Sequence, residues 1–177
     1  MAIQSKSATC DCRHSSAFKL CFIFIFQPTA KLQIYNSTAE AKIPAVLDYL
    51  STVIEDGCKI LIFAHHQTMI DSISQYLDKK KVLYIRIDGK TPSSLRPDLV
   101  SKFQDKENVK AAVLSIKASG LGLTLTAAST VIFAELSWTP GDIIQAEDRA
   151  HRFGQANSVN VYYLLANDTA DDIICIS

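Results

Sequence analysis

The sequence has no excess of either charge. Its 177 residues include 18 lysines and arginines and 18 aspartates and glutamates, so the formal net charge is zero at neutral pH. Such a chain has no global positive field to attract nucleic acid, and any contact with DNA or RNA must come from a local patch. Residues 79–96 are locally basic, with six lysines and arginines against one aspartate. A run of this kind is more often a solvated surface than a binding site.

A stretch long enough to cross a membrane is also missing. The apolar run at residues 20–26 has seven residues, whereas spanning a bilayer takes about 20. Basic residues precede this run, as in a signal peptide, but residues 27–30 form a poor cleavage pattern. We therefore expect no membrane partner and no secretion.

The five cysteines form no regular disulfide framework, because their number is odd and their spacing is irregular. Cys58 and Cys175 lie among apolar residues and are expected to be buried thiols. Three cysteines and a histidine within residues 10–21 match no common structural zinc site, so we predict no metal site. Reduced thiols are typical of proteins of the cytosol or nucleus.

A phosphate-binding loop is absent as well. The segment D-G-K-T at residues 88–91 follows a strand-like run and precedes a helix-like run, as such a loop would. The loop needs the pattern G-x-x-x-x-G-K-[ST], and Tyr84 occupies the position of its first glycine. We therefore interpret the segment as a tight turn with Gly89 at a positive φ. Lys90 remains a candidate for contact with a phosphate backbone.

The rest of the sequence alternates short apolar runs with longer periodic ones. We predict strands at 59–64, 82–87, 111–116, 131–136 and 159–166, and helices at 40–56, 67–79, 91–104, 139–152 and from 169 onward. Pro44 is expected to delay the start of the first helix. This alternation indicates an α/β fold with a parallel sheet and helices on both faces. Residues 1–38 are expected to form an irregular N-terminal segment with one strand at 20–26, followed by a domain at 39–177.

The predicted helix at 139–152 has clear start and stop signals. Thr139 can serve as its N-cap, Pro140 suits the first helical position, and Asp142 can complete a capping box. Gly154 is placed to end the helix. This stretch is therefore the most sharply bounded helix that the sequence predicts.

The two faces of this helix differ. Ile143, Ala146 and Ala150 form an apolar face, and the opposite face is polar, with Gln145, Asp148, Arg149 and Arg152. Two guanidinium groups one turn apart can grip phosphate oxygens, and an arginine delivered from a neighbouring lobe can stabilise a transferring phosphoryl group. Helix geometry alone favours the other interpretation, a solvated face with an Asp–Arg pair.

Binding sites in parallel sheets lie at the loops that leave the carboxyl ends of the strands. Three such loops are expected at 65–67, 88–91 and 117–126. The last contains Gly120 and Gly122 in a G-x-G pattern, which either lets the backbone approach an anion or packs on the sheet through its leucines. His65 and His66 have no acid or thiol at ligand spacing, so we interpret them as ordinary loop histidines.

Several segments appear in a fixed order: I-L-I-F-A-H-H, I-D-G-K-T, A-A-V-L-S-I-K-A-S-G-L-G-L-T-L-T and Q-A-E-D-R-A-H-R-F-G-Q. Together they resemble the C-terminal helicase motifs of the Swi/Snf-like DNA-dependent ATPases of helicase superfamily two. The pattern Q-A-E-D-R-A-H-R and its distance from G-L-G-L-T are highly specific. The segments F-A-E-L-S-W-T-P-G and S-V-N-V-Y-Y-L-L-A-N-D-T-A-D are most similar to the annealing-helicase branch. The resemblance covers about residues 40–177.

The resemblance implies a RecA-like lobe that is one half of a two-lobed ATPase. In this family the first lobe binds ATP and Mg²⁺, and the second closes over the nucleotide and supplies arginines. By motif position the catalytic candidates are Arg149 and Arg152, with Arg152 the stronger candidate for the arginine finger. The implied nucleotide-side residues are Gly120, Gly122 and Gln145. The implied contacts to a DNA strand are Gly89, Lys90, Ser115 and Lys117.

The same resemblance implies an ATP-dependent DNA translocase or annealing helicase that acts in DNA repair, at replication forks or in chromatin remodelling. Its implied partners are a first RecA-like lobe and DNA, which is contacted through its phosphates and therefore without sequence preference. The implied location is the nucleus.

The sequence also departs from the family. Neither a phosphate-binding loop nor a D-E-x-H box occurs in it, so we expect no ATP hydrolysis by this chain alone. Phe153 stands where the family more usually has isoleucine. Two alternatives stay open: a non-catalytic module that holds DNA or docks onto a complete helicase, and a truncated product without a role of its own. The second lobe of an RNA helicase is disfavoured, because its H-R-x-G-R-x-x-R pattern is absent.

Overall fold

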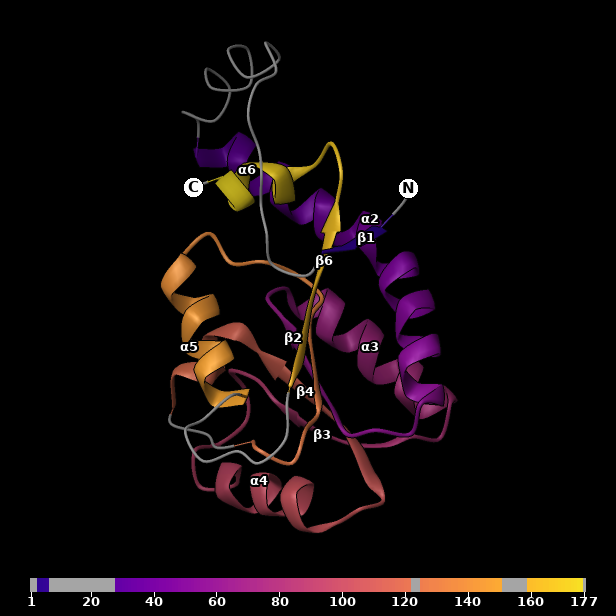
Figure 1. Ribbon diagram of the computed structural model, residues 1–177. Helices are drawn as coiled ribbons and strands as arrows, with labels where there is room; N and C mark the ends of the chain where they lie inside the picture. The colour runs from indigo at the N-terminus through magenta and orange to yellow at the C-terminus, as the bar shows by residue number, and fades with distance from the viewer. Residues whose placement is uncertain (1–2, 7–27, 122–124, 151–158, 177) are drawn as a thin grey trace.

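The computed structural model describes residues 3–6, 28–121, 125–150 and 159–176, which form a six-stranded sheet with helices packed against it (Figure 1). The strands are β1 (Ile3–Lys6), β2 (Ile60–Ala64), β3 (Leu83–Ile87), β4 (Val109–Ser115), β5 (Thr130–Phe133) and β6 (Asn160–Ala166). Their order in the sheet is β1-β6-β5-β2-β4-β3. Strands β2 to β6 run parallel, and β1 pairs antiparallel with β6. The predicted parallel sheet is confirmed, with each of the five predicted strands close to its expected position.

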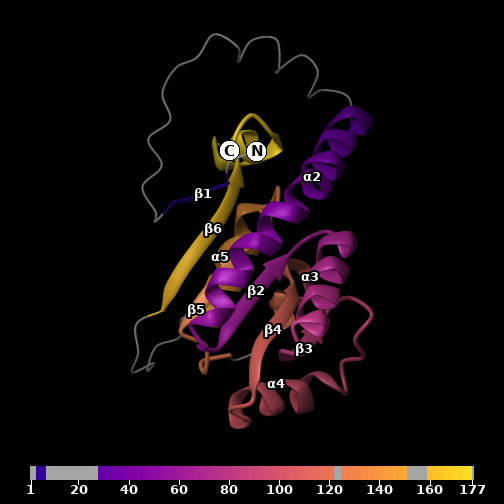
Figure 2. The same ribbon diagram turned by 90° about the vertical axis from the view of Figure 1, so that its right-hand side faces the viewer.

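Helices cover both faces of this sheet (Figure 2). They are α2 (Pro28–Glu55), α3 (Gln67–Lys79), α4 (Arg96–Asp105), α5 (Pro140–Ala150) and α6 (Ala170–Ile176), with the 3-10 helix η1 (Ile116–Leu121) after β4. Successive side chains of a strand point to opposite faces. Ile60 and Ile62 of β2 accordingly pack with α2 and α3, whereas Leu61 and Phe63 pack with α4 and α5. All five residues of β2 are buried, as expected for a central parallel strand.

Helix α2 is longer than the sequence predicts. It begins at Pro28 rather than near residue 40, and β1 forms at residues 3–6, so the expectation of an irregular segment is wrong for residues 3–6 and 28–38. The helix also continues through Pro44, which does not delay its start. Proline removes one helical hydrogen bond, but Pro44 is exposed, and burial of Val46 and Leu50 against the sheet stabilises the helix around it. The division of the chain into a family-matched domain from residue 39 stays a prediction.

Two further predictions concern helix ends. Gly57 ends α2 as expected, with φ of +70° and its N–H donating to the Ile54 carbonyl oxygen at 3.1 Å. Helix α4 begins at Arg96 rather than at residue 91. The preceding residues form a separate turn in which the Leu95 N–H donates to the Pro92 carbonyl oxygen at 3.1 Å. The threonine–proline pair therefore starts this turn and not the helix.

The predictions for the cysteines, the N-terminal strand and membrane-spanning segments have different outcomes. Cys58 is exposed in the loop between α2 and β2, so the prediction of a buried thiol is wrong for this residue. Its apolar sequence neighbours belong to β2, whereas Cys58 itself precedes the strand. The strand expected at 20–26 and the cysteines and histidine of residues 10–21 lie outside the described residues, as does the side chain of Cys175. Within the described residues, none of the helices combines the length and apolar character needed to span a bilayer.

A buried ion pair joins the first and last described helices. The Lys42 ammonium of α2 donates to Asp171 Oδ2 of α6 at 2.6 Å and to the Leu164 carbonyl oxygen of β6 at 2.7 Å. Asp171 Oδ2 also accepts the Ala166 N–H at 2.9 Å. The two charged side chains are 1% and 3% exposed. Each buried charge therefore has a partner, and the pair fixes α2 and α6 against the end of β6.

Candidate functional site

The carboxyl ends of the parallel strands lie at one edge of the sheet, where the predicted site residues were expected. Gly89 and Lys90 are exposed in the loop after β3. Ser115 is the buried last residue of β4, and Lys117 is exposed in η1. The residues that the resemblance assigns to DNA thus follow two adjacent strands at the same edge. Whether they contact DNA stays a prediction.

A buried carboxylate organises the centre of this edge. Glu135 follows β5 and is 2% exposed. Its Oε2 accepts the backbone N–H groups of His65 and His66, each at 2.8 Å, and its Oε1 accepts the Nδ1–H of His66 at 2.7 Å. The other ring nitrogen of His66 lies 3.0 Å from Oδ1 of Asn36 on α2. Glu135 therefore ties the ends of β2 and β5 together and links them to α2.

Both histidines lie in the loop between β2 and α3, as predicted, but His66 has a carboxylate partner that its sequence neighbours did not indicate. We found no acid near them in sequence, but Glu135 lies 69 residues further along the chain and reaches His66 only through the pairing of β2 with β5. One sequence signal could have indicated this contact. An acidic residue inside the apolar run V-I-F-A-E-L is expected to be buried, and a buried carboxylate needs hydrogen-bond donors.

The ionisation of Glu135 reflects these contacts. Burial alone would raise its pKa, but the hydrogen bonds from the ring and backbone of His66 and from the backbone of His65 outweigh burial and hold the pKa below its ordinary value of 4.5. Glu135 is therefore charged at neutral pH. Because the folded state binds this proton less tightly than the unfolded state, the contribution of Glu135 to stability is complete above about pH 5 and is lost as the pH falls through its lowered pKa.

Replacing Glu135 by alanine should destabilise the fold by about 3 kcal/mol at neutral pH, because three donors lose their partner and a buried unsatisfied donor costs about 1–3 kcal/mol. Glu135→Gln, which keeps one acceptor oxygen, should cost less. Urea denaturation at several pH values measures both effects. The difference in free energy of unfolding between the parent and Glu135→Gln should become smaller as the pH falls below about 4. A difference that stays constant down to pH 3 would contradict the role of the charged carboxylate.

An aromatic cluster surrounds this carboxylate. The Tyr35 ring of α2 lies 5.3 Å from that of His65, 4.4 Å from that of His66 and 5.8 Å from that of Trp138. Burial raises the pKa of Tyr35 well above its ordinary value, so the phenol stays protonated and donates to the Leu136 carbonyl oxygen. The helical segment that the sequence did not predict therefore supplies part of the packing at this edge.

His65 is a neutral group in this cluster. Burial lowers its pKa, and the neighbouring His66 and Lys117 lower it further, so the imidazole is uncharged at neutral pH. Its Nδ1 is buried and has no hydrogen-bond partner within the described part of the chain. The charges of Lys117 on η1 and Asp142 on α5 lie near enough to His65 to influence its pKa in opposite directions.

The start of α5 differs from the expected capping box. The Thr139 N–H donates to Ser137 Oγ at 3.2 Å, and Ser137 Oγ donates to Asp142 Oδ2 at 2.9 Å. Asp142 therefore binds the serine side chain before the helix, because Ser137 is buried next to it. The predicted apolar face is confirmed for Ala146, which is buried, and for Ile143, which is half-buried in the same cluster.

The predicted arginines are only partly described. Helix α5 includes Arg149 in its last turn, but the side chains of Asp148, Arg149 and Ala150 are not described. Gln145 is exposed on α5, and Gly120 lies in η1, which packs against α5. The remaining candidates, Arg152 and Gly122, lie outside the described residues, as do Phe153 and Gly154. Their catalytic and nucleotide-binding roles stay predictions.

The turn at residues 88–91 is confirmed, but its geometry differs from the prediction. Gly89 does not have a positive φ, and a Cβ at this position would meet no atom within 4 Å. Asp88 holds the turn instead. Its Oδ1 accepts the Lys90 N–H at 2.9 Å and the Thr91 hydroxyl at 3.3 Å, and the Thr91 N–H donates to its carbonyl oxygen at 3.1 Å. The Asp88 carboxylate therefore stabilises the turn, which the sequence had led us to attribute to a positive φ at Gly89.

The basic run at 79–96 does not form one patch. Arg86 pairs with Asp71 of α3 at 2.7 Å and with Asp88 at 2.8 Å. The Arg96 guanidinium donates twice to the Thr91 carbonyl oxygen, at 3.1 and 2.9 Å. Residues 79–81 lie at the end of α3 and just after it, at the opposite edge of the sheet from residue 90. Among the lysines and arginines of this run, Lys90 is the one that is both exposed and at the carboxyl edge.

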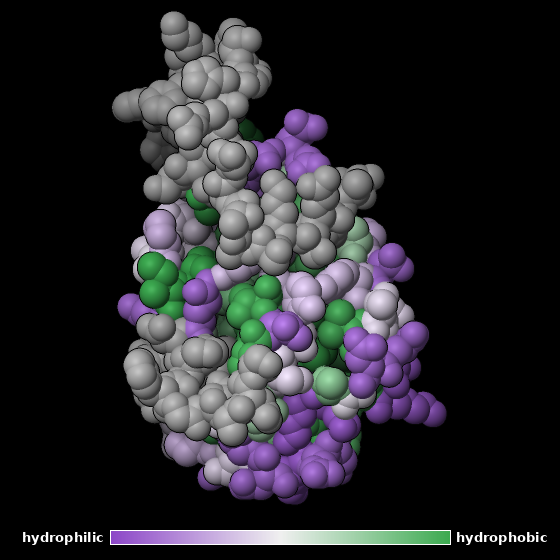
Figure 3. All heavy atoms as spheres, in the orientation of Figure 1, coloured by the Kyte–Doolittle hydropathy of each residue, from purple (hydrophilic) through white to green (hydrophobic). Residues whose placement is uncertain are grey.

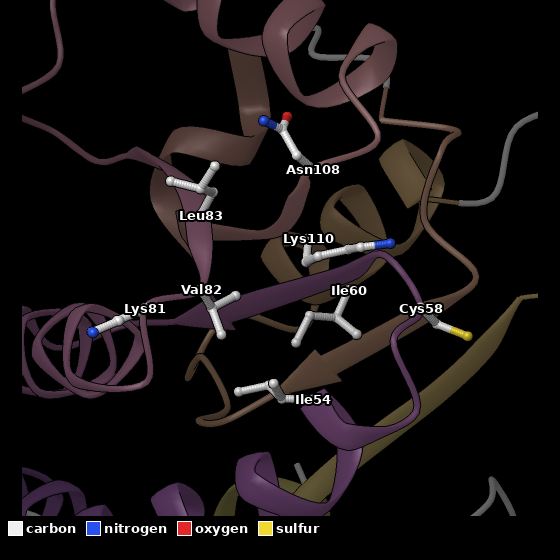
Figure 4. Close-up of a pocket in the computed structure, with 8 residues that line it drawn as sticks. All are labelled: Ile54, Cys58, Ile60, Lys81, Val82, Leu83, Asn108 and Lys110. Carbon is white, nitrogen blue, oxygen red and sulfur yellow. The ribbon is translucent and has the colours of Figure 1, made fainter.

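One hollow of the described surface lies away from this site (Figure 4). It has a volume of about 300 Å³ and is lined mainly by apolar residues at the amino ends of β2, β3 and β4. Figure 4 shows Lys81 and Lys110 extending from either side of Val82 and Ile60. Sites in parallel sheets form at the carboxyl ends of the strands, so this hollow is not part of the candidate site.

Residues 41–154 match the family described as the helicase conserved C-terminal domain. This match covers more than half of the 177 residues. The chain belongs to the helicase C-terminal domain family. This helicase C-terminal domain is 55% identical over 146 residues to the "SWI/SNF-related matrix-associated actin-dependent regulator of chromatin subfamily A-like protein 1" of Xenopus laevis, a match that covers 82% of this chain and 15% of that protein.

Two further comparisons agree with this family assignment. The domain is 50% identical over 143 residues to the "DNA annealing helicase and endonuclease ZRANB3" of Homo sapiens, covering 80% of this chain and 13% of that protein. Its fold is similar to the crystal structure of the C-terminal part of the Fun30 ATPase domain, with a TM-score of 0.70 and 34% identity over 76% of this chain and 44% of that one. The expected resemblance and the RecA-like α/β fold are confirmed. The helicase C-terminal domain spans about a seventh of the length of the curated relatives.

The described residues do not fit a magnesium site of their own. Within the described ranges, no three His, Cys, Asp or Glu side chains lie close enough together to hold a metal ion. The carboxylates at the carboxyl edge already have partners: Glu135 binds the two histidines, and Asp88 binds Arg86 and the turn. A nucleotide and its metal would therefore need ligands other than these.

Proposed function

We propose that this helicase C-terminal domain acts as the second RecA-like lobe of an ATP-dependent DNA translocase or annealing helicase of the nucleus. The observation that supports this most strongly is the match to the helicase C-terminal family over residues 41–154, at 55% identity to a SWI/SNF-related relative. The geometry agrees, because the motif loops after β2, β3, β4 and β5 leave the same edge of the sheet.

In the proposed reaction a first lobe holds ATP and Mg²⁺, and this domain closes over the nucleotide from the side of α5. In that arrangement Arg149 and Arg152 would bind the γ-phosphate and would stabilise the charge that develops on it during transfer. The contact between α5 and η1, the segment that contains Gly120 and Lys117, supports a coupled role for the two elements. Movement of α5 on nucleotide binding would therefore move a segment that faces DNA.

The surface of α5 suits contact with another lobe. Ile144 is 57% exposed beside the exposed Gln145, and Figure 3 shows hydrophobic atoms at the surface over this helix. By contrast, the outward side of α4, at the bottom of the same view, is hydrophilic. An apolar side chain next to a polar stripe is the composition expected at an interface between domains, which is more polar than a permanent one. We assign this face of α5 to the first lobe.

Binding of DNA would use the loops after β3 and β4. Lys90 and Lys117 are exposed cations at the carboxyl edge, and the sheet pairing of β3 with β4 brings the starts of these two loops together. Lysine binds a phosphate as a point charge and reads no base, so the contact would be independent of sequence and sensitive to salt. A chain with no net charge would then bind DNA through these local cations and not through a global field.

Measuring ATP turnover with DNA tests the proposal directly. The chain alone should show no turnover, because its 177 residues contain no phosphate-binding loop. Mixing it with a separately prepared first lobe of a Swi/Snf-like ATPase should produce turnover that rises when DNA is added. Turnover by the chain alone, or a failure of the mixture to exceed the first lobe by itself, would refute the assignment as a second lobe.

A further inference from the structure

The Arg86 guanidinium is held by two carboxylates within the chain, although its sequence position suggests a free basic residue. Its Nε and Nη2 both donate to Asp88 Oδ2, at 2.9 and 2.8 Å, and Nη2 also lies 2.7 Å from Asp71 Oδ1. Its Nη1 lies 3.5 Å from Ser74 Oγ. The side chain is 29% exposed, against 5% for the Asp88 side chain. Arg86 is therefore placed to hold two carboxylates and not to bind a phosphate.

Asp88 connects this guanidinium to the turn that carries Lys90. One carboxylate oxygen of Asp88 binds Arg86, and the other accepts the Lys90 N–H and the Thr91 hydroxyl. The backbone N–H of Asp88 also donates to Thr91 Oγ1 at 3.1 Å. The orientation of the Asp88 carboxylate thus decides whether the backbone of Lys90 is held. Arg86 sets that orientation, because its Nε and Nη2 grip the opposite oxygen.

Helix α3 anchors the other end of this chain of contacts. Asp71 accepts from Gln67 Nε2 at 3.0 Å as well as from Arg86. These hydrogen bonds from Gln67 and Arg86 hold the pKa of Asp71 below its ordinary value, so its carboxylate is charged at neutral pH. Gln67 is the first residue of α3 and directly follows the histidines bound by Glu135. The turn is therefore fixed to a rigid helix and not only to its own strand.

We propose that Arg86 is a positioning residue for DNA binding, which acts through Asp88 to hold Lys90 toward a backbone phosphate while making no contact with DNA itself. This inference rests on the proposed function, since it assumes that Lys90 contacts DNA. Holding the turn in advance lowers the entropy that is lost when Lys90 binds a phosphate, so affinity should depend on Arg86 even at a distance from the ligand.

Arg86→Gln and Lys90→Ala, singly and together, test the proposal in the 177-residue chain. Binding of a fluorescent partial-duplex oligonucleotide is followed by anisotropy across a series of salt concentrations. Lys90→Ala should weaken binding about fivefold to tenfold at 0.1 M salt and reduce the salt slope by about one, as for the loss of one phosphate contact. Arg86→Gln should weaken binding to a similar extent, and the double variant should bind no more weakly than Lys90→Ala alone.

Three controls separate positioning from other effects. Lys102→Gln removes the same charge from an exposed position on α4 and should change the affinity by less than twofold. Arg86→Lys can hold one carboxylate but not both, so it should bind DNA with an affinity between those of the parent and Arg86→Gln. Hydrogen exchange at the Lys90 amide should be faster in Arg86→Gln than in the parent, while the urea midpoints show that both variants are folded at the assay temperature.

The outcomes distinguish this inference from the proposed function. Equal single effects without further loss in the double variant support the positioning role. Effects that add, with a second reduction in the salt slope, show that Arg86 contacts phosphate directly and overturn it. An effect of Lys90→Ala with none of Arg86→Gln overturns it as well and leaves the proposed function intact. If Lys90→Ala binds like the parent, or the parent does not bind, the DNA contact assigned to this turn and the positioning role fail together.

Discussion

Replacing Arg152 by alanine should lower DNA-stimulated ATP turnover about a thousandfold when this domain works with a first lobe. A planar guanidinium delivered to the γ-phosphate stabilises charge that develops only in the transition state, and such arginines contribute about 10³ to 10⁵ in turnover. Arg152→Lys should recover little of this loss, because an ammonium cannot form the two parallel hydrogen bonds. Steady-state turnover of the mixed lobes with saturating DNA measures the effect.

The effect should be confined to turnover. Because the first lobe holds most of the nucleotide, the affinity of the mixture for ATP should change by less than about tenfold in Arg152→Ala. Lys102→Ala, an exposed cation on α4, serves as the matched control and should retain parent turnover. If Arg152→Ala keeps more than a tenth of the parent turnover while the lobes still associate, then Arg152 is not the arginine finger. Arg149→Ala in the same assay then tests the other candidate.

Asp171→Ala should destabilise the fold by about 3–5 kcal/mol, the largest stability effect that we expect from a single substitution. The substitution leaves the Lys42 ammonium, which is 1% exposed, without its carboxylate in a site that excludes water. The Leu164 carbonyl oxygen would be its remaining partner among the contacts described above. Urea denaturation at neutral pH measures the loss.

The double variant Lys42→Met/Asp171→Ala should be more stable than Asp171→Ala alone. Removing the unpaired ammonium relieves its desolvation cost, and methionine fills a similar volume. The neighbouring Asp172→Ala provides a matched control. Asp172 is exposed and accepts the N–H groups of Asp168 and Thr169 at the start of α6, so its loss should cost about 1 kcal/mol. A cost for Asp171→Ala no greater than that for Asp172→Ala would contradict the importance of the buried pair.

Much of the fold could be predicted from local pattern. Helix α3 and the ends of β2 and β6 follow from hydrophobic periodicity, since a half-buried helix repeats its apolar residues every three or four positions and a buried strand is apolar throughout. The start of α2 could not be predicted in this way. Polar and apolar residues alternate without a clear period in its first three turns. Tyr35 is buried only because β2 and β5 bring Leu136 and the two histidines next to it.

The candidate site, too, could be predicted only in part from the sequence. The motif resemblance assigned Lys90 and Lys117 to DNA contacts, and the structure places both at the carboxyl edge. The resemblance did not indicate the roles of Glu135 and Asp71. These two carboxylates are important because of what they pair with, and their partners lie 69 and 15 residues away in the chain. Arg86 was grouped with the basic run by sequence proximity, whereas its charge is neutralised by Asp88, two residues along the chain, and by Asp71, which the packing of α3 on β3 brings near.

The sequence by itself determined the family, the alternation of strands and helices, and the placement of the motif loops at the carboxyl ends of the strands. Those features depend on residue type and spacing, which a linear pattern records. Only the tertiary structure decided which charged groups are free and which are bound: Lys90 is exposed, whereas Arg86, Lys42 and Glu135 are held by partners. The physical reason is that hydrogen bonds and ion pairs act over a few ångströms in space, and distance along the chain does not determine that proximity.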